Sequence, residues 1–152
     1  MREKTVEWAL KEKIIAIVRG MEAKDCLRVA QALYDGGIRL MEITYDQRDP
    51  AQWAKTADAI GKIAEAFEGR MLVGAGTVTT PELVTRTRDA GGQFIISPDT
   101  NPAVIARTRE LELVSMPGAM TPSEILAAHA AGADFVKLFP AGDLGVSYLK
   151  AI

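Results

Sequence analysis

The chain has 152 residues, of which 48% are hydrophobic and 25% are charged, and its formal net charge is −2. This length and balance are typical of one globular domain, so we expect residues 1–152 to form a single domain. The small negative charge argues against binding to nucleic acid or to an anionic membrane. Cys26 is the one cysteine, which excludes an internal disulfide. No apolar run approaches the ~20 residues of a membrane span, and the charged N-terminus lacks a signal-peptide core, so we expect a cytoplasmic protein.

Short apolar segments alternate with longer amphipathic segments along the whole chain. Strand, helix, strand in repetition indicates parallel βαβ units. Parallel strands are buried on both faces and therefore consist almost entirely of hydrophobic residues, as these segments do. The segments predicted to be strands are 14–18, 40–44, 71–75, 94–97, 113–116 and 134–139.

Glycines and threonine–proline pairs mark where the intervening helices end and begin. Gly36–Gly37, Gly91–Gly92 and Gly132 each follow a helical pattern, where a left-handed residue commonly ends a helix. The segments "TTPE" (79–82) and "MTPSE" (120–124) each offer a capping threonine, a proline at the first helical position and an early acid. These signals support the same succession of helices.

Six βα units are compatible with a doubly wound sheet or with a (βα)8 barrel of the TIM type. The segment "GAGTVT" lacks the third glycine of the dinucleotide-binding fingerprint, which disfavours the doubly wound sheet. We therefore predict an α/β fold of the TIM-barrel type. A full barrel typically needs more than ~200 residues, so this chain is expected to supply the first six of eight βα units.

In a parallel barrel, the reactive groups collect at the carboxyl ends of the strands. Two of the residues there have simpler explanations, because Arg19 suits an exposed surface and Thr77 suits a helix cap. Glu42 is harder to explain, because a carboxylate within a buried strand needs a partner or a task. The predicted strands deliver to this end Arg19, Glu42 with Thr44, Thr77, Ser97–Pro98, Pro117–Gly118 and Lys137.

Lys137 lies within the apolar run "DFVKLF", where an ammonium must find water, find a partner or lose its proton. The only histidine, His129, lies in a helical pattern, so no histidine is available for a catalytic triad. No cluster has metal-ligand spacing, and we predict neither a metal nor a cofactor. One lysine and one buried acid are the minimum for Schiff-base chemistry on a carbonyl compound.

The chain resembles the class I 2-keto-3-deoxy-6-phosphogluconate (KDPG) aldolases, which include the 4-hydroxy-2-oxoglutarate (KHG) aldolases. The order and spacing of four short motifs make the resemblance specific, and it covers nearly all of residues 14–152. The motifs are "GAGTV", "FIISP", "PGAMTP" and "KLFPA".

The resemblance implies a lyase that cleaves 4-hydroxy-2-oxo acids to pyruvate and an aldehyde. It makes Lys137 the Schiff-base lysine and Glu42 the general acid and base. It also implies that Thr77 contacts the pyruvate carboxylate and that Arg19 lines the mouth of the barrel, at the carboxyl ends of the strands. Pro98 and Phe139 are implied to form pocket walls. The implied partners are a small 2-oxo acid and further copies of the chain, since family members are usually trimers.

Two departures from the family pattern bear on these expectations. Asp46 stands where much of the family has a carboxylate-binding arginine, and Arg48 is a candidate replacement. The seventh and eighth strands, whose glycine loops hold the distal phosphate or acid, are not expected within this sequence. An alternative interpretation is therefore an aldolase fragment without useful turnover that self-associates through open sheet edges. A different phosphate-handling barrel enzyme is less compatible with the lysine and the glutamate.

Overall fold

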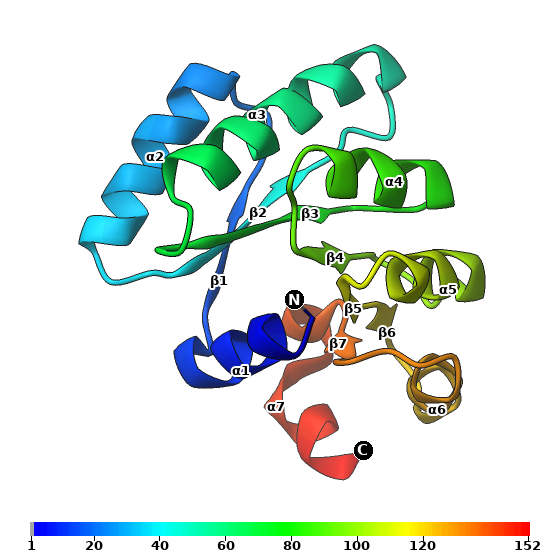
Figure 1. The fold of residues 1–152 in the computed structure, drawn as a ribbon. Coiled ribbons are helices and arrows are strands. Elements are labelled where there is room, and N and C mark those ends of the chain that lie inside the picture. Colours follow the sequence, from blue (N-terminus) through cyan, green and yellow to red (C-terminus); the bar gives the residue numbers. More distant parts are fainter. Residues whose placement is uncertain (1) are drawn as a thin grey trace.

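The computed structural model describes residues 2–152, which fold into alternating strands and helices (Figure 1). A short 3-10 helix, η1 (Pro50–Gln52), precedes one of the α-helices. The strands are β1 (Ile15–Val18), β2 (Leu40–Thr44), β3 (Leu72–Gly76), β4 (Phe94–Ile96), β5 (Val114–Met116), β6 (Gly118–Ala119) and β7 (Lys137–Leu138). The helices are α1 (Arg2–Glu12), α2 (Ala23–Asp35), α3 (Trp53–Ala66), α4 (Pro81–Asp89), α5 (Pro102–Glu110), α6 (Pro122–Ala130) and α7 (Ala141–Ala151).

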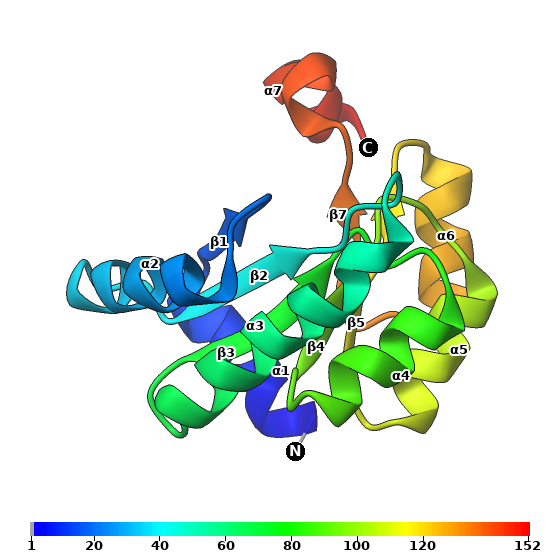
Figure 2. The same ribbon diagram turned by 90° about the horizontal axis from the view of Figure 1, so that it is seen from above.

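The strands form a curved parallel sheet in sequential order. β1 to β5 lie side by side in the order β1-β2-β3-β4-β5, and β6 pairs in parallel with β7. Helices α2 to α6 cover the outside of this arc (Figure 1). Seen from above, α7 stands apart from the other elements and is joined to them through β7 (Figure 2). This arrangement gives six consecutive βα units of the (βα)8-barrel type, as predicted.

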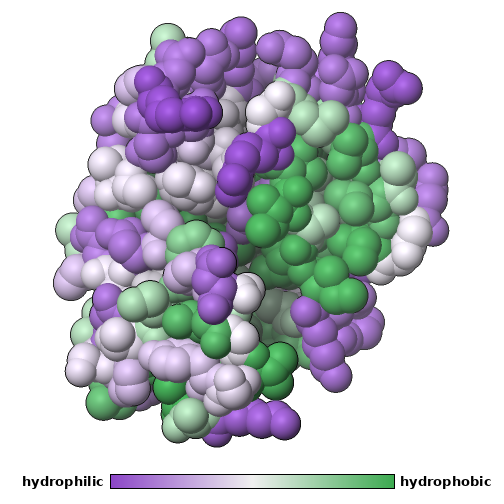
Figure 3. Space-filling view, turned by 180° about the vertical axis from the view of Figure 1, so that it is seen from behind, coloured by the Kyte–Doolittle hydropathy of each residue, from purple (hydrophilic) through white to green (hydrophobic). Residues whose placement is uncertain are grey.

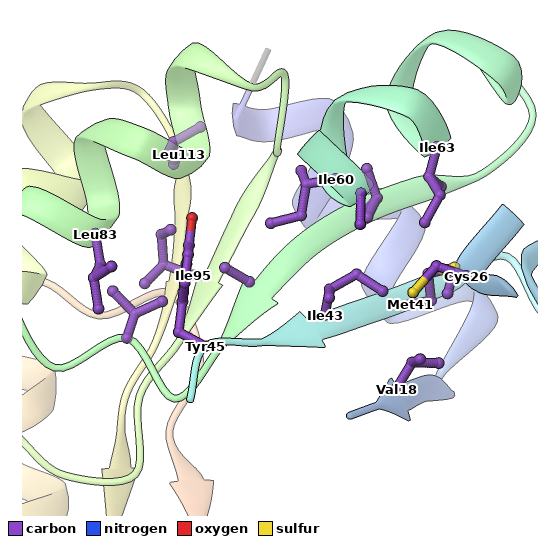
Figure 4. Packing of buried hydrophobic residues seen from close by; sticks show 14 of the residues in the cluster. Val18, Cys26, Met41, Ile43, Tyr45, Ile60, Ile63, Leu83, Ile95 and Leu113 are labelled. Carbon is purple, nitrogen blue, oxygen red and sulfur yellow. The ribbon is translucent and has the colours of Figure 1, made fainter. Parts of the chain in front are cut away.

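The outer face of the sheet packs against the helices in the larger of two hydrophobic clusters. Met41 and Ile43 of β2 meet Ile60 and Ile63 of α3, and all four are buried (Figure 4). Cys26 of α2 is completely buried in the same cluster, where it packs as a small core residue. Burial of these apolar side chains supplies the main driving force for folding, at roughly 25 cal/mol per Å².

The inner face of the sheet carries the second cluster, which forms the apolar floor of the barrel. Alternate residues of a strand point to opposite faces, so the neighbours of the outward-facing residues point inward. Helix α1 lies under this floor and contributes Val6, Trp8 and Ala9. The buried members contributed by the strands are Leu40, Leu72, Phe94, Ile96, Val114 and Met116.

The predicted strands are confirmed in position, but the sixth is shorter than predicted, and an additional short strand, β6, follows the fifth. The sixth strand, predicted over 134–139, is limited to Lys137–Leu138. Pro117, which has no N–H for a ladder hydrogen bond, separates β5 from the short strand β6. The Pro117 carbonyl instead accepts a hydrogen bond of 2.8 Å from the Lys137 backbone N–H. This bond fixes the position of β7 beside β6.

The predicted helix boundaries are also confirmed. Thr80 and Thr121 cap α4 and α6 through their side chains, each followed by proline, and Glu124 completes a capping box with Thr121. Gly37, Gly91 and Gly132 all have left-handed φ angles after their helices. Because Thr80 provides the cap of α4, the alternative role of Thr77 as a helix cap is wrong.

Gly74 of β3 allows β4 to approach closely, and this leads to a test of the packing. A Cβ atom at this position would lie 2.3 Å from a ring carbon of Phe94 and 2.4 Å from the Phe94 carbonyl oxygen. We expect Gly74→Ala to lower the free energy of unfolding by about 1–3 kcal/mol, as overpacking does. Urea denaturation measures the change. Gly142→Ala is the control, because a Cβ there has nothing within 4 Å, and equal stability of the two variants would contradict the prediction.

Candidate active site

Glu42 lies in the middle of β2 and is buried, with only 3% of its surface exposed. β2 pairs with β1 and β3, and Glu42 lies opposite Ile17 and Gly74 in the two ladders. It shares the inner face of the strand with Leu40, two residues earlier. The strand pattern therefore places a carboxylate inside the barrel, directly above the apolar floor.

Gly76 of β3 provides the space for this carboxylate. A Cβ atom at Gly76 would lie 2.5 Å from Glu42 Oε1 and 2.9 Å from Thr44 Cγ2. Any larger residue would displace one of these side chains. The second glycine of "GAG" is therefore required to leave room for the Glu42 carboxyl group.

Two opposing effects act on the pKa of Glu42. Burial raises the pKa above its ordinary value of 4.5, because desolvation penalises the charged form. The positive charges of Lys137 and Arg19 act in the opposite direction and lower it by a smaller amount. Within residues 2–152, Glu42 Oε2 is buried without a hydrogen-bond partner. An acid held in this way is suited to exchanging a proton with a bound molecule.

Lys137 of β7 lines the same inner cavity as Glu42, which has a volume of about 370 Å³. Its side chain is half-buried, and the cavity walls near it include Ile17, Met116 and Phe135. Lys137 Nζ lies 4.9 Å from the centroid of the Phe139 ring. The structure therefore brings the predicted lysine and the predicted acid into one largely apolar space.

A larger cavity of about 800 Å³ lies at the carboxyl ends of the strands. Its walls include all four predicted substrate-binding residues, Arg19, Thr77, Pro98 and Phe139. Arg19 is exposed, as the surface interpretation of this residue requires, and it also lines this mouth. Phe139 lines this cavity and Lys137 lines the inner one, so the contact between the two side chains places the cavities next to each other.

Asp46 and Arg48, the departure from the family pattern, also line the mouth and are bonded to each other. Arg48 donates from Nε at 3.2 Å and from its backbone N at 2.9 Å to Asp46 Oδ1. The hydrogen bonds from Arg48 lower the pKa of Asp46, which favours its charged form. The mouth therefore carries an ion pair between Asp46 and Arg48.

Two further residues at these cavities were not predicted from the sequence. Lys13 lines the inner cavity, and Gln47 lines the mouth. Gln47 donates from Nε2 to the Thr77 carbonyl oxygen at 2.8 Å. Neither residue stands in a recognisable motif, and their roles follow only from contacts between segments far apart in the chain.

Among residues 2–152, no three histidine, cysteine, aspartate or glutamate side chains are grouped so that they could hold a metal ion. His129 is exposed on α6, as expected. The same part of the chain contains no helix that is both long enough and apolar enough to span a membrane.

Comparison with known families identifies the class of protein that this fold and site represent. The family model described as "KDPG and KHG aldolase" matches residues 6–152. A probable 2-dehydro-3-deoxy-6-phosphogalactonate aldolase of Rhizobium meliloti is 41% identical over 143 residues, covering 94% of this chain and 65% of that protein. The Escherichia coli 2-dehydro-3-deoxy-6-phosphogalactonate aldolase is 33% identical, with 97% and 69% covered. The chain belongs to the KDPG and KHG aldolase family.

Solved structures agree with this assignment. The native KDPGal structure superposes with a TM-score of 0.81 at 35% identity, covering 90% of this chain and 64% of that one. The KDPG aldolase of Legionella pneumophila, solved with pyruvate captured as a covalent carbinolamine, gives a TM-score of 0.78 at 32% identity, with 90% and 64% covered. The chain therefore spans slightly less than two thirds of several relatives that it matches.

The raised pKa of Glu42 predicts a pH-dependent stability. A carboxyl whose folded pKa is raised stabilises the fold below the unfolded pKa, and this contribution is lost as pH rises through the folded pKa. We therefore expect the stability of Glu42→Gln relative to the wild type to increase with pH above about 4.5, because the amide carries no charge to desolvate. Urea unfolding between about pH 4 and 8 measures the difference.

A control variant separates this effect from general acid sensitivity. Glu65→Gln replaces an exposed carboxylate of α3, where burial imposes no such penalty. Its stability relative to the wild type should vary little over the same pH range. A difference between Glu42→Gln and wild type that does not change with pH would contradict the prediction.

Proposed function

We propose that this chain is a class I aldolase that cleaves 4-hydroxy-2-oxo acids to pyruvate and an aldehyde through a Schiff base on Lys137. The observation that carries the proposal is the shared cavity of Lys137 and the buried Glu42. The names of the relatives and the covalent carbinolamine in the Legionella pneumophila enzyme support the same chemistry. This chemistry is metal-free, and the chain would act in the cytoplasm.

The first half of the reaction builds the imine. The neutral Lys137 amine attacks the C2 carbonyl of the substrate and forms a carbinolamine. The protonated form of Glu42 gives its proton to the leaving hydroxyl, so that water departs and a protonated imine and the Glu42 carboxylate remain. Thr77 and Arg19, which line the mouth, are suited to hold the substrate carboxylate during these steps.

The second half breaks the carbon–carbon bond. The Glu42 carboxylate accepts the proton of the C4 hydroxyl, directly or through a water molecule. The C3–C4 bond breaks and the aldehyde leaves. The electron pair of the broken bond passes into the protonated imine, which becomes an enamine. Protonation at C3 restores the imine, and hydrolysis releases pyruvate and the free amine. The raised pKa of Glu42 suits a group that must both accept and return a proton.

The test of this function is covalent trapping with pyruvate and borohydride. We expect the wild type to gain one reduced pyruvate adduct on Lys137 and Lys137→Met to gain none, because the imine needs an amine at this position. Peptide mapping by mass spectrometry locates the adduct and distinguishes Lys137 from Lys13 in the same cavity. Lys62→Met is the matched control, because Lys62 pairs with Asp58 on α3. An adduct on Lys13, or an adduct that persists in Lys137→Met, would sink the assignment.

The assembly proposed for the protein is a homo-oligomer, the trimer that the family resemblance implies. Support comes from hydrophobic side chains gathered on one side of the molecule (Figure 3). A related chain forms part of a designed cage built by fusing symmetric oligomeric domains. Large apolar side chains are exposed near β1 and on the last helices: Leu10, Ile14, Ile17, Met21, Leu126, Val146 and Leu149. Exposed apolar groups of this extent commonly mark an interface.

Light scattering over a dilution series tests the assembly. We expect a particle larger than one chain at micromolar concentration, and a smaller one for the double variant Leu10→Glu/Ile14→Glu, because charges oppose burial of the patch. Lys24→Glu is the matched control, since it changes the net charge by the same two units on the exposed surface of α2. A monodisperse monomer in the wild type would refute the proposal.

A further inference from the structure

The backbone of Thr77 has a conformation that its side chain disfavours. Its φ angle is 56°, in the left-handed region, which β-branched residues rarely occupy. Such a conformation persists where the surrounding structure holds it in place. Thr77 follows directly after Gly76 at the end of β3 and lines the mouth. The groups that bond to this loop therefore decide where its polar atoms point.

Gln47 is the side chain that reaches this loop from the neighbouring one. Its Nε2 donates to the Thr77 carbonyl oxygen at 2.8 Å, and its Oε1 accepts from Thr79 Oγ1 at 2.7 Å. Both ends of the amide are thus used, one on each side of Val78. The Thr79 carbonyl in turn accepts a longer bond of 3.4 Å from Asn101 of the next loop.

The loop that carries Gln47 is itself held on both sides. Trp53 donates from Nε1 to the Asp46 carbonyl oxygen at 2.9 Å. The Asp46 carboxylate binds both the backbone N–H and the guanidinium of Arg48. Gln47 lies between these two residues, and its own side chain bonds to Thr77. A side chain whose backbone is already fixed loses less entropy when it forms its hydrogen bonds.

We infer that Gln47 is a positioning residue that holds Thr77 in its left-handed conformation and thereby sets the site for the carboxylate of a 2-oxo acid. This inference rests on the proposed function, in which Thr77 contacts that carboxylate. Gln47 acts through Thr77 and takes no part in the proton transfers. It lies in the segment "TYDQR", between Asp46 and Arg48, which bond to each other.

The test measures the pyruvate concentration that gives half-maximal borohydride trapping. We expect Gln47→Ala to raise it about 5- to 10-fold, the loss of one or two hydrogen bonds, while trapping at saturation stays unchanged. Gln31→Ala is the matched control, because Gln31 is an exposed glutamine of α2 that bonds only to Asp35. An unchanged half-saturation point in Gln47→Ala would overturn the inference, as would an equal rise in Gln31→Ala.

A double-mutant cycle separates action through Thr77 from a direct contact with the substrate. A glycine at this position adopts the left-handed conformation without strain, so the Thr77→Gly variant no longer needs the hydrogen bond from Gln47 to hold it there. In this background, Gln47→Ala should change the half-saturation point less than about two-fold, because the two substitutions act on the same step. A full additive effect would show that Gln47 does not act through Thr77.

A crystal structure of Gln47→Ala tests the role of Gln47 without relying on the reaction with pyruvate. We expect Thr77 to leave the left-handed region and take a negative φ angle. If Thr77 keeps its φ near 56°, Gln47 does not set the conformation of Thr77, whatever the trapping experiment shows. If the wild type gains no adduct with pyruvate, the proposed function fails, and the role toward a 2-oxo acid fails with it. The structure of the variant still decides whether Gln47 sets the conformation of Thr77.

Discussion

A carboxylate inside a parallel sheet needs room and nearby positive charge, and the arrangement around Glu42 provides both. The inner face of β3 carries Leu72, Gly74 and Gly76 at alternate positions. The absence of a side chain at Gly74 admits the ring of Phe94, and its absence at Gly76 admits the Glu42 carboxyl. Along β3, the interior therefore changes from the apolar floor at Leu72 to the polar cavity beside Gly76. Glu42 lies at the boundary between these two regions.

The position of Lys137 depends on contacts at the opposite end of the barrel. Asp134, three residues before Lys137, accepts a hydrogen bond of 2.8 Å from the Ser115 backbone N–H through Oδ2. Its other oxygen pairs with Arg2 of α1. The N-terminal helix therefore anchors the segment that leads into β7, in addition to packing beneath the apolar floor. The apolar floor and the segment that carries Lys137 are therefore parts of one packing arrangement.

The sequence predicted the features that depend on local pattern. Apolar segments located the strands, and Thr80 and Thr121 located two helix starts, because periodicity and capping are set by neighbouring residues. The short strand β6 and the limited extent of β7 were missed, because these two strands are defined by their pairing with each other across the chain. Gln47 was missed for the same kind of reason: its partner lies 30 residues away, and an isolated glutamine in a loop carries no signal.

The two groups of site residues are held by different parts of the fold. Glu42 and Lys137 stand on strands, where ladder bonds and core packing fix them. Thr77, Asp46 and Gln47 stand on the loops after β2 and β3, where side-chain bonds fix them. Substitutions in the loops change the mouth without disturbing the acid or the amine. The Asp46–Arg48 ion pair and the hydrogen bond from Gln47 to the Thr77 carbonyl are contacts of this kind, made within and between these two loops.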